Sequence, residues 1–194
     1  MADQREVTTM PSEGTTELQT ILVASDIHGS HEAMDKLLRY AEELCADMLI
    51  LAGDTCPACS TAIVKGIWYS PVPILMVRGN CESPWDFQEA GLPVPPIYRT
   101  ETFGERAILV THGDRFPSPV GLPVQLKEQD IFICGHTHRP VVHHEPGRPW
   151  HLNPGSTTYP RGREGATFAI VDTDGISIRS LDENRPIAGL QAYW

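Results

Sequence analysis

Five apolar runs, each followed closely by a short polar motif, are the feature of this sequence that most limits its fold. The motifs are Asp26-Ile27-His28, Gly53-Asp54, Gly79-Asn80-Cys81-Glu82, His112-Gly113 and Gly135-His136-Thr137-His138. Each apolar run is short and reads as a buried strand. In open α/β sheets, ligands bind in the crevice outside the carboxyl ends of the strands. We therefore expect these distant motifs to converge at one end of a sheet.

Strands and helices alternate in the first half of the chain. Strands are expected at residues 20–25, 48–52 and 74–77. Between the first two, apolar residues from Met34 to Cys45 recur at three- and four-residue intervals, which predicts an amphipathic helix with Ser30 as its N-cap. A shorter helix is expected over Thr61–Trp68. This alternation predicts a parallel α/β sheet.

The second half of the chain is predicted to be mostly β, after a stretch that is broken up by prolines. These prolines are Pro84, Pro93, Pro95 and Pro96. Extended segments are expected at about residues 97–102, 107–111, 131–134, 140–144, 166–172 and 176–181. Turn signals separate these segments, and no repeat or linker divides the chain.

Length and composition predict one domain. With 194 residues, of which 41% are hydrophobic, the chain can bury one substantial core, which we place over residues 18–194. Residues 1–17 are rich in Thr, Glu, Ser and Asp, have no apolar period, and are predicted to form a flexible N-terminal leader.

Charge and cysteine content limit the partners and the compartment. The net charge of −10 argues against a general attraction to nucleic acid or to an anionic membrane, so any phosphate must be bound locally. No apolar run approaches the ~18 residues needed to span a bilayer. The cysteines are odd in number and the N-terminus lacks a signal-type apolar stretch, which favours a cytoplasmic protein.

The polar motifs carry the side chains of a metal site. In an extended segment, residues two apart share a face, so Asp26 with His28, and His136 with His138, are expected to point into one site. Carboxylate, imidazole and amide oxygen are ligands for Mn, Fe or Zn ions, whereas soft sites are rich in thiolate.

Further short motifs support a resemblance to a known family. They are SDIHGS at Ser25–Ser30, RGNC at Arg78–Cys81 and NPGS at Asn153–Ser156. With the metal motifs they resemble the calcineurin-like metallophosphoesterase superfamily, most closely its small phosphodiesterase branch in bacteria and archaea. The resemblance covers roughly Ile21–Ala188. It implies an α/β (α+β) fold, a layered β-sandwich flanked by helices.

The resemblance also implies seven metal ligands. One ion would be held by Asp26, His28 and His138, the other by Asn80, His112 and His136, with Asp54 bridging both. The ions would be divalent transition metals, Mn first, with Fe, Zn or Ni as alternatives. A hydroxide bridging the two ions would attack phosphorus in line, and Asp54, Asn80, Cys81 and His112 would be the catalytic residues.

Three functions share this pattern. The first is hydrolysis of a phosphodiester bond in a small phosphate-ester substrate. The second is phosphomonoester hydrolysis of a small metabolite, which would use the same ligands and differ in pocket shape. The third is a non-catalytic scaffold of the same fold with a degenerate metal site, but no ligand histidine is lost here. The substrate, the native metal and any homo-oligomer stay open.

Two residues depart from the family pattern. Cys81 stands where most of the superfamily has His, which helps to bind the phosphate and to protonate the leaving oxygen. A thiol with a pKa of about 8.5 is a weaker acid than imidazolium, so we expect a preference for good leaving groups. Glu82 stands where the small branch usually has Asp, which changes the hydrogen bonding around the ligands.

The remaining reactive residues are expected to be structural or solvated. The histidines outside the metal site are His31, His143, His144 and His151. Cys56 and Cys59 form one C-x-x-C, which is weak as a redox or zinc motif and reads as an incidental loop pair. Arg78 could approach the phosphate or pair with a carboxylate. The NPGS segment is expected to close one side of the site.

Overall fold

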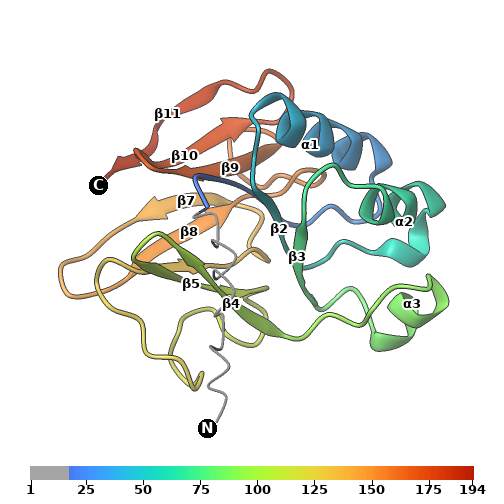
Figure 1. Ribbon diagram of the computed structural model, residues 1–194, viewed down its shortest axis with the longest axis horizontal. Coiled ribbons are helices and arrows are strands. Elements are labelled where there is room, and N and C mark those ends of the chain that lie inside the picture. Colours follow the sequence, from blue (N-terminus) through green and yellow to red (C-terminus); the bar gives the residue numbers. More distant parts are fainter. Residues whose placement is uncertain (1–17) are drawn as a thin grey trace, which may run out of the picture.

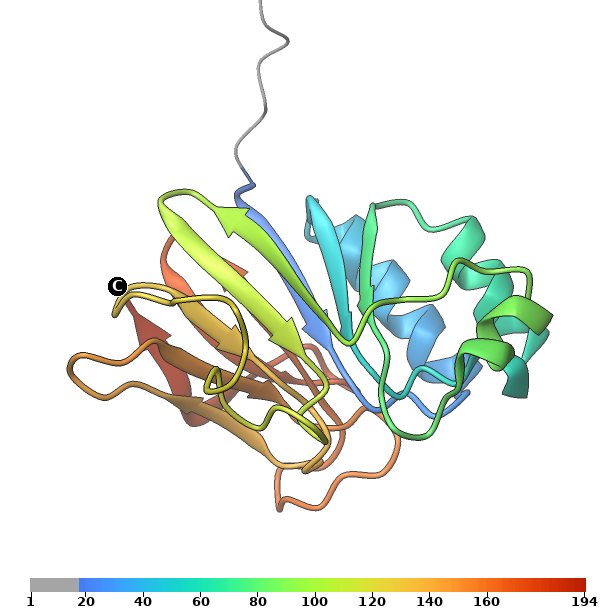
Figure 2. The ribbon, with the colours of Figure 1, turned by 90° about the horizontal axis from the view of Figure 1, so that it is seen from below.

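The computed structural model describes residues 18–194, so the predicted leader, residues 1–17, lies outside the described residues. Two β-sheets face each other across an apolar interior, and helices cover the outer face of one of them (Figure 1, Figure 2). This is the layered α/β (α+β) arrangement that the resemblance implied.

The first sheet has six strands in the order β11-β10-β9-β1-β2-β3. The bounds are β1 Thr20–Ala24, β2 Met48–Ala52, β3 Ile74–Val77, β9 Thr167–Asp172, β10 Gly175–Ser180 and β11 Pro186–Tyr193. Strands β1, β2 and β3 are parallel, as predicted. Strand β9 runs antiparallel to β1, and β10 and β11 continue the sheet with antiparallel pairing, so the complete sheet is mixed.

The second sheet has five strands in the order β4-β5-β6-β8-β7. The bounds are β4 Tyr98–Phe103, β5 Arg106–Thr111, β6 Ile131–Ile133, β7 Pro140–His143 and β8 Trp150–Pro154. Strands β5, β6 and β8 are parallel. The carboxyl ends of the parallel strands in both sheets point toward the same region of the molecule (Figure 2).

Alternation along β1 and β2 separates two apolar clusters. Ile21 and Val23 pack between the sheets with residues of β5 and β6 such as Ile108 and Ile131. The residues in between, such as Leu22, face the helices. Both strands are buried on both faces and for this reason read as continuous apolar runs.

The helices are α1 His31–Glu43, α2 Thr61–Trp68 and α3 Pro84–Glu89, with a short 3-10 turn, η1, at Pro57–Cys59. Helix α1 begins where it was predicted, because the Ser30 hydroxyl accepts a hydrogen bond from the Ala33 N–H. Among residues 18–194, no helix is both long and apolar enough to cross a membrane.

Three elements were missed by the sequence analysis, each for a local reason. Helix α3 starts with Pro84, which reads as a breaker but is tolerated in the first turn, where Ser83 and Asp86 form a capping box. Strand β8 contains His, Asn and Pro, and therefore lacks the apolar run of a buried strand. Strand β11 is an edge strand with Pro186 and Gly189, two residues that weaken a strand pattern.

Candidate metal centre

The candidate site lies where the loops after five strands meet. Asp26, Asp54 and Asn80 follow β1, β2 and β3 of the first sheet, while His112 and His136 follow β5 and β6 of the second. Backbone hydrogen bonds join these loops within each sheet, such as that from Asp26 N–H to the Gly53 carbonyl, 3.1 Å. The motifs therefore converge at the strand ends, as predicted.

The backbone that carries these residues is not extended, and this part of the sequence argument is wrong. Asp26, His28, Asp54, His136 and His138 have φ values of 56°, 47°, 51°, 67° and 59°, in the left-handed region. Left-handed turns are uncommon for residues other than glycine, although Asp and His enter them more readily than most. The pairs separated by one residue thus belong to tight turns rather than to one face of a strand.

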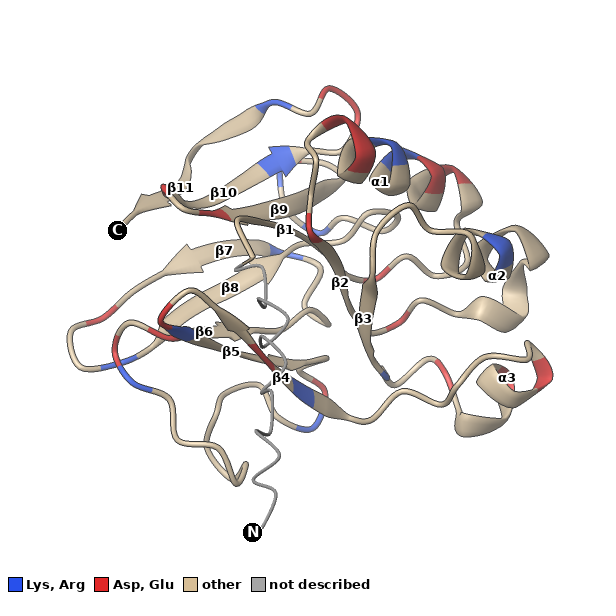
Figure 3. Cartoon of the chain, in the orientation of Figure 1, with Lys and Arg blue, Asp and Glu red and all other residues tan. Residues whose placement is uncertain are grey.

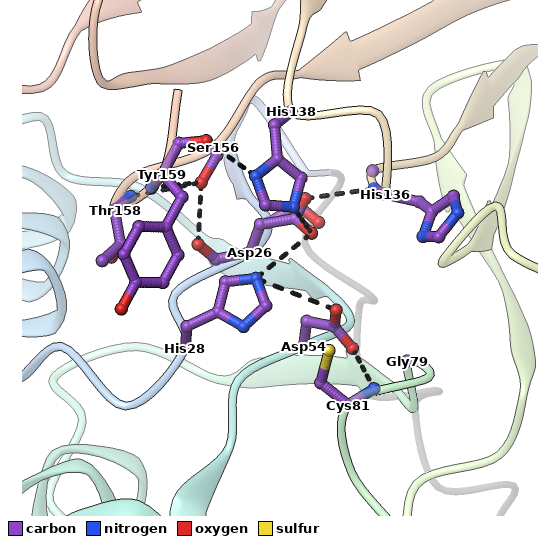
Figure 4. Close-up of polar contacts among 12 residues, drawn as sticks. Asp26, His28, Asp54, Gly79, Cys81, His136, His138, Ser156, Thr158 and Tyr159 are labelled. Atoms are coloured by element: carbon purple, nitrogen blue, oxygen red, sulfur yellow. Dashed lines mark hydrogen bonds and ion pairs between the residues drawn. The ribbon is translucent and has the colours of Figure 1, made fainter. Parts of the chain in front are cut away.

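One group of donors surrounds the Asp26 carboxylate, which is fully buried. His138 Nε2 lies 3.1 Å from Asp26 Oδ1, and His28 Nε2 lies 3.9 Å from the same oxygen (Figure 4). The Asp26 Oδ2 atom accepts a hydrogen bond from the His136 N–H, 3.1 Å. Asp26 therefore connects the loop after β1 with the loop after β6.

A second group surrounds the Asp54 carboxylate, of which 2% is exposed. His112 Nε2 lies 3.3 Å from Asp54 Oδ2, and His28 Nε2 lies 3.9 Å from it. His112 Nε2 also lies 3.2 Å from Asn80 Oδ1. The Cys81 N–H donates to Asp54 Oδ1, 2.8 Å. Asp54 thus lies between the two sets of predicted ligands, where a bridging ligand would stand.

The His136 ring is placed differently from the other predicted ligands. Its side chain is exposed and points away from Asp26 in Figure 4. Its ring centroid lies 5.2 Å from that of His112. The donor groups whose atoms all lie within 4.8 Å of one another are Asp26-His28-His138, His28-Asp54-Cys81 and Asp26-Asp54-His112, which do not include His136.

Two buried atoms fit a role as metal ligands. Among the described residues, Asp26 Oδ1 and His28 Nε2 are buried and accept or donate no hydrogen bond. A buried polar atom without a partner is costly, so such an atom points to a missing ligand. Nitrogen and carboxylate oxygen suit a divalent transition metal. The residues present therefore fit the metal that the motifs predict.

Hydrogen bonds fix which nitrogen of two histidines faces the centre. The Nδ1 atom of His112 donates to the Ala52 carbonyl, 2.9 Å, and that of His138 donates to the Tyr159 carbonyl, 2.7 Å. Each bond holds the ring and leaves Nε2 directed at a carboxylate, the arrangement typical of metal-ligating histidines.

Glycines allow the loops to approach closely. A Cβ atom at Gly79 would lie 2.1 Å from Asp54 Oδ1 and 2.5 Å from the Asp54 nitrogen. A Cβ atom at Gly135 would lie 1.9 Å from the hydroxyl oxygen of Ser25. Any side chain at either position would displace a loop that carries predicted ligands.

Several residues outside the predicted ligands hydrogen-bond to these loops. The sequence analysis expected the NPGS segment near the site but did not predict its individual contacts. Ser156 donates to the Asp26 carbonyl, 3.0 Å, and Asn153 Nδ2 donates to the Gly135 carbonyl, 2.8 Å. The NPGS segment therefore lies beside the site. Thr158, beyond it, donates to the Ile27 carbonyl, 2.8 Å, and nothing in the sequence pattern singled it out.

The Glu82 side chain connects the loop after β2 with the loop after β3. It is buried, and its carboxylate accepts hydrogen bonds from the Cys56 N–H, 2.7 Å, and the Gly79 N–H, 3.0 Å. Burial raises the pKa of this carboxyl, although both hydrogen bonds act in the opposite direction. The departure from Asp that the sequence shows here thus supplies an acceptor for two backbone amides.

The charged groups of the centre perturb one another. Burial disfavours the charged form of His112, but the hydrogen bond and negative charge of Asp54 outweigh it and raise the pKa of His112 to about 9. Burial also opposes ionisation of Asp54, yet its contacts with His112 and Cys81 lower its pKa. Burial and the neighbouring Asp54 carboxylate raise the pKa of Cys81 to about 11, so its thiol is protonated at neutral pH.

We expect metal binding to release a proton from His112. Its pKa lies at about 9 instead of 6.5, so the metal-free protein carries an imidazolium that must lose its proton before Nε2 can bind an ion. Affinity for Mn²⁺ should rise with pH, up to about tenfold per pH unit, and level off above about pH 9. Calorimetric titration in two buffers of different ionisation enthalpy measures the released proton. Affinity that is flat between pH 6.5 and 9 would contradict this assignment.

Other cysteines and histidines lie around or outside the centre. The five cysteines are free thiols, and Cys56 is buried with its sulfur 3.8 Å from the Cys81 carbonyl, while Cys59 is exposed. His151 is half-buried and lies 3.2 Å from the Cys134 sulfur. His144 stacks on Trp150. His31 and His143 are exposed.

The chain belongs to the calcineurin-like phosphoesterase superfamily, whose domain description matches residues 20–175, and it is a phosphoesterase. The small phosphodiesterase branch that the motifs indicated is confirmed by its relatives. Phosphodiesterase YfcE from Escherichia coli K12 is 30% identical over 183 residues, which cover 88% of this chain and 97% of YfcE.

Solved structures agree with this classification. The structure of the E. coli phosphoesterase YfcE has a TM-score of 0.78 and 29% identity, and the match covers 90% of this chain and 98% of that one. A predicted phosphoesterase from Streptococcus pneumoniae TIGR4 has a TM-score of 0.65 and 24% identity over 93% of this chain and 99% of the other, which supports the fold alone.

Proposed function

We propose that this protein hydrolyses phosphodiester bonds of small phosphate esters with two divalent ions held by the seven predicted ligands. The observation that carries the proposal is the pair of buried atoms without hydrogen-bond partners in the described residues, Asp26 Oδ1 and His28 Nε2, beside the nitrogen of His138 and the carboxylate of Asp54. The similarity to phosphodiesterase YfcE supports the diester substrate.

Charge explains why the site needs ions to bind a phosphate. Asp26 and Asp54 place two carboxylates at the centre, and the chain as a whole carries a net charge of −10. Lys and Arg are spread over the sheets, helices and loops rather than gathered on one face (Figure 3). An anionic ester would be repelled by the carboxylates alone, so bound cations must reverse the local charge.

Bound divalent ions would supply Lewis acidity toward the phosphoryl oxygens and activate water as the nucleophile. The protein contributes the alignment of the ligands. Asp54 stays ionised because its pKa is lowered, and it lies between His28 and His112. The backbone N–H of Cys81 holds the other oxygen of that carboxylate, and the protonated Cys81 thiol stands beside it as a donor for the leaving oxygen.

The decisive experiment combines metal analysis with a pair of substrates. Chelation should abolish hydrolysis of bis(p-nitrophenyl) phosphate, and Mn²⁺ should restore it, because nitrogen and oxygen ligands suit Mn²⁺ while a histidine-rich site disfavours Mg²⁺. The diester should be hydrolysed faster than p-nitrophenyl phosphate. Full activity in protein verified to be free of metal would exclude the mechanism, and faster hydrolysis of the monoester would favour the second candidate, a phosphomonoesterase.

Replacing Cys81 with His should raise turnover most for esters with alkoxide-like leaving groups. Imidazolium is a much stronger acid than a thiol whose pKa is raised to about 11, and general acid catalysis contributes typically ~10²–10⁴-fold when the acid is well placed. Nitrophenolate leaves without help and should show the smallest change. Steady-state kinetics with a matched pair of aryl and alkyl diesters measures the difference.

Cys59→His is the control, because Cys59 is exposed and belongs to none of the donor groups of the centre. It should leave both substrates unaffected. An equal change for aryl and alkyl esters in Cys81→His would show that residue 81 acts on phosphate binding or on metal geometry instead of on the leaving group.

A further inference from the structure

A thiol lies among the nitrogen and oxygen donors of the centre. The ligand atoms of His28, Asp54 and Cys81 all lie within 4.8 Å of one another, in a group that shares His28 with one of the other two groups and Asp54 with the other. In Figure 4 the Cys81 side chain turns toward Asp54. One ion can therefore contact a nitrogen, a carboxylate oxygen and a sulfur at the same time.

The histidine of this group has a ring nitrogen without a hydrogen-bond partner among residues 18–194. His28 Nε2 is buried and has no hydrogen-bond partner in the described part of the chain, although Asp26 and Asp54 oxygens lie 3.9 Å away. The Cys81 sulfur accepts a hydrogen bond from Asn80 Nδ2, 3.3 Å, which helps to hold it in place and stabilises negative charge on sulfur. The Cys81 residue is exposed, so an ion can reach the sulfur from solvent.

Cys56 is the other thiol near His28, but its position is different. Its sulfur lies 4.0 Å from His28 Nδ1, whereas the carboxylates lie near Nε2, the nitrogen on the opposite side of the ring. The Cys56 thiol also has a backbone partner, since it donates to the Cys81 carbonyl at 3.8 Å. Cys56 therefore faces away from the donors that His28 shares with Asp54.

We propose that His28, Asp54 and Cys81 form a thiolate-containing site that captures thiophilic ions such as Zn²⁺ or Cd²⁺. As the sulfur–metal bond forms, the thiol proton passes to water or buffer. Soft ligands favour Zn²⁺ and Cd²⁺, while Mn²⁺ prefers oxygen and nitrogen. The Cys81 sulfur should therefore raise the affinity of the site for Zn²⁺ and Cd²⁺ but not for Mn²⁺. The ion that occupies the centre thus decides whether Cys81 is a free thiol or a ligand.

This arrangement has a consequence for catalysis, which rests on the proposed function. A sulfur bound to an ion holds no proton for the leaving oxygen. Zn²⁺ or Cd²⁺ should therefore lower turnover of esters with poor leaving groups more than that of nitrophenyl esters, and Mn²⁺ should not. Cys81 would in this way make the enzyme sensitive to the metal supplied to it.

Optical titration of the full-length protein, freed of metal and reloaded with Co²⁺ or Cd²⁺, tests the thiolate directly. Wild-type protein should develop a sulfur-to-metal charge-transfer band. Cys81→Ser should lose that band and bind Cd²⁺ at least about tenfold more weakly. Loss of a residue that hydrogen-bonds a metal ligand costs about tenfold or more in affinity, and loss of the ligand itself should cost at least as much. The affinity for Mn²⁺ should change by less than about twofold. Circular dichroism verifies that the variant is folded.

Cys56→Ser and Cys59→Ser are the matched controls, and both should keep the band. Metal binding by wild-type protein without the band would overturn the proposed thiolate site and leave the two-metal proposal intact. A band that persists in Cys81→Ser would assign the sulfur to another cysteine and would also overturn it. If wild-type protein binds no transition metal at all, both proposals fail.

Discussion

Replacing Asp54 with Asn should lower the rate of phosphodiester hydrolysis by more than roughly 100-fold. Loss of a residue that only hydrogen-bonds a metal ligand already costs up to about 100-fold in activity, and Asp54 is predicted to be a ligand itself. The variant should also retain fewer metal ions per chain. The amide has no negative charge, and if its oxygen keeps the hydrogen bond to the Cys81 N–H, its NH₂ group faces the nitrogens of His28 and His112. A donor would then stand where an ion must be held.

Asn is the informative substitution at this position. The φ of Asp54 is 51°, and Asn tolerates this left-handed conformation, so the backbone should be retained. Steady-state kinetics and metal analysis measure the effect. Asp182→Asn is the control, since it removes the same charge from an exposed side chain paired with Lys36. Normal turnover and full metal content in Asp54→Asn would contradict a bridging role.

The second large effect is expected from Gly79→Ala, a change of one methyl group. The new Cβ would lie 2.1 Å from Asp54 Oδ1 and 2.5 Å from the Asp54 nitrogen, which is backbone and cannot rotate away. The loops after β2 and β3 must separate, so activity should fall by more than about tenfold. Overpacking of this kind costs about 1–3 kcal/mol of stability. Enzyme kinetics and urea unfolding measure the two effects.

Gly66→Ala is the control, because it adds a methyl group at a crowded position away from the metal centre. Its Cβ would lie 3.1 Å from Cγ of Met34, a tight contact with a flexible side chain in the interior between helices. Activity should be retained in this control. If Gly79→Ala is as active as wild-type protein, the close approach of Gly79 to Asp54 is not required for the centre.

The sequence predicted where the site lies better than it predicted how the site is built. Apolar runs marked β1, β2, β3, β5 and β6 because these strands are buried, and the polar residues after them were placed correctly at the strand ends. The reason offered for the D-x-H and H-x-H pairs was wrong. Period-two reasoning holds within a strand, whereas Asp26 and His138 occupy left-handed turns that residue spacing does not reveal.

Long-range contacts account for what was missed. The hydrogen bonds of Glu82 to Cys56 and Gly79 depend on how the loops after two different strands approach each other, and a single sequence carries no signal for that approach. Strand β8 is recognised as a strand through its pairing with β6 and β7, since its own residues include Asn153 and Pro154. Tertiary pairing outweighs local propensity there.

Five predicted ligands have left-handed backbone conformations, which lower the stability of the fold. The five residues are Asp26, His28, Asp54, His136 and His138. In residues other than glycine such conformations cost on the order of 1–3 kcal/mol each, and the net stability of a domain is only about 5–15 kcal/mol. Ligand residues thus oppose folding by an amount comparable to what the whole chain gains. Glycine enters this conformation without steric cost, so a descendant that replaced these ligands with glycine would lose the chemistry and gain thermal robustness with the same change.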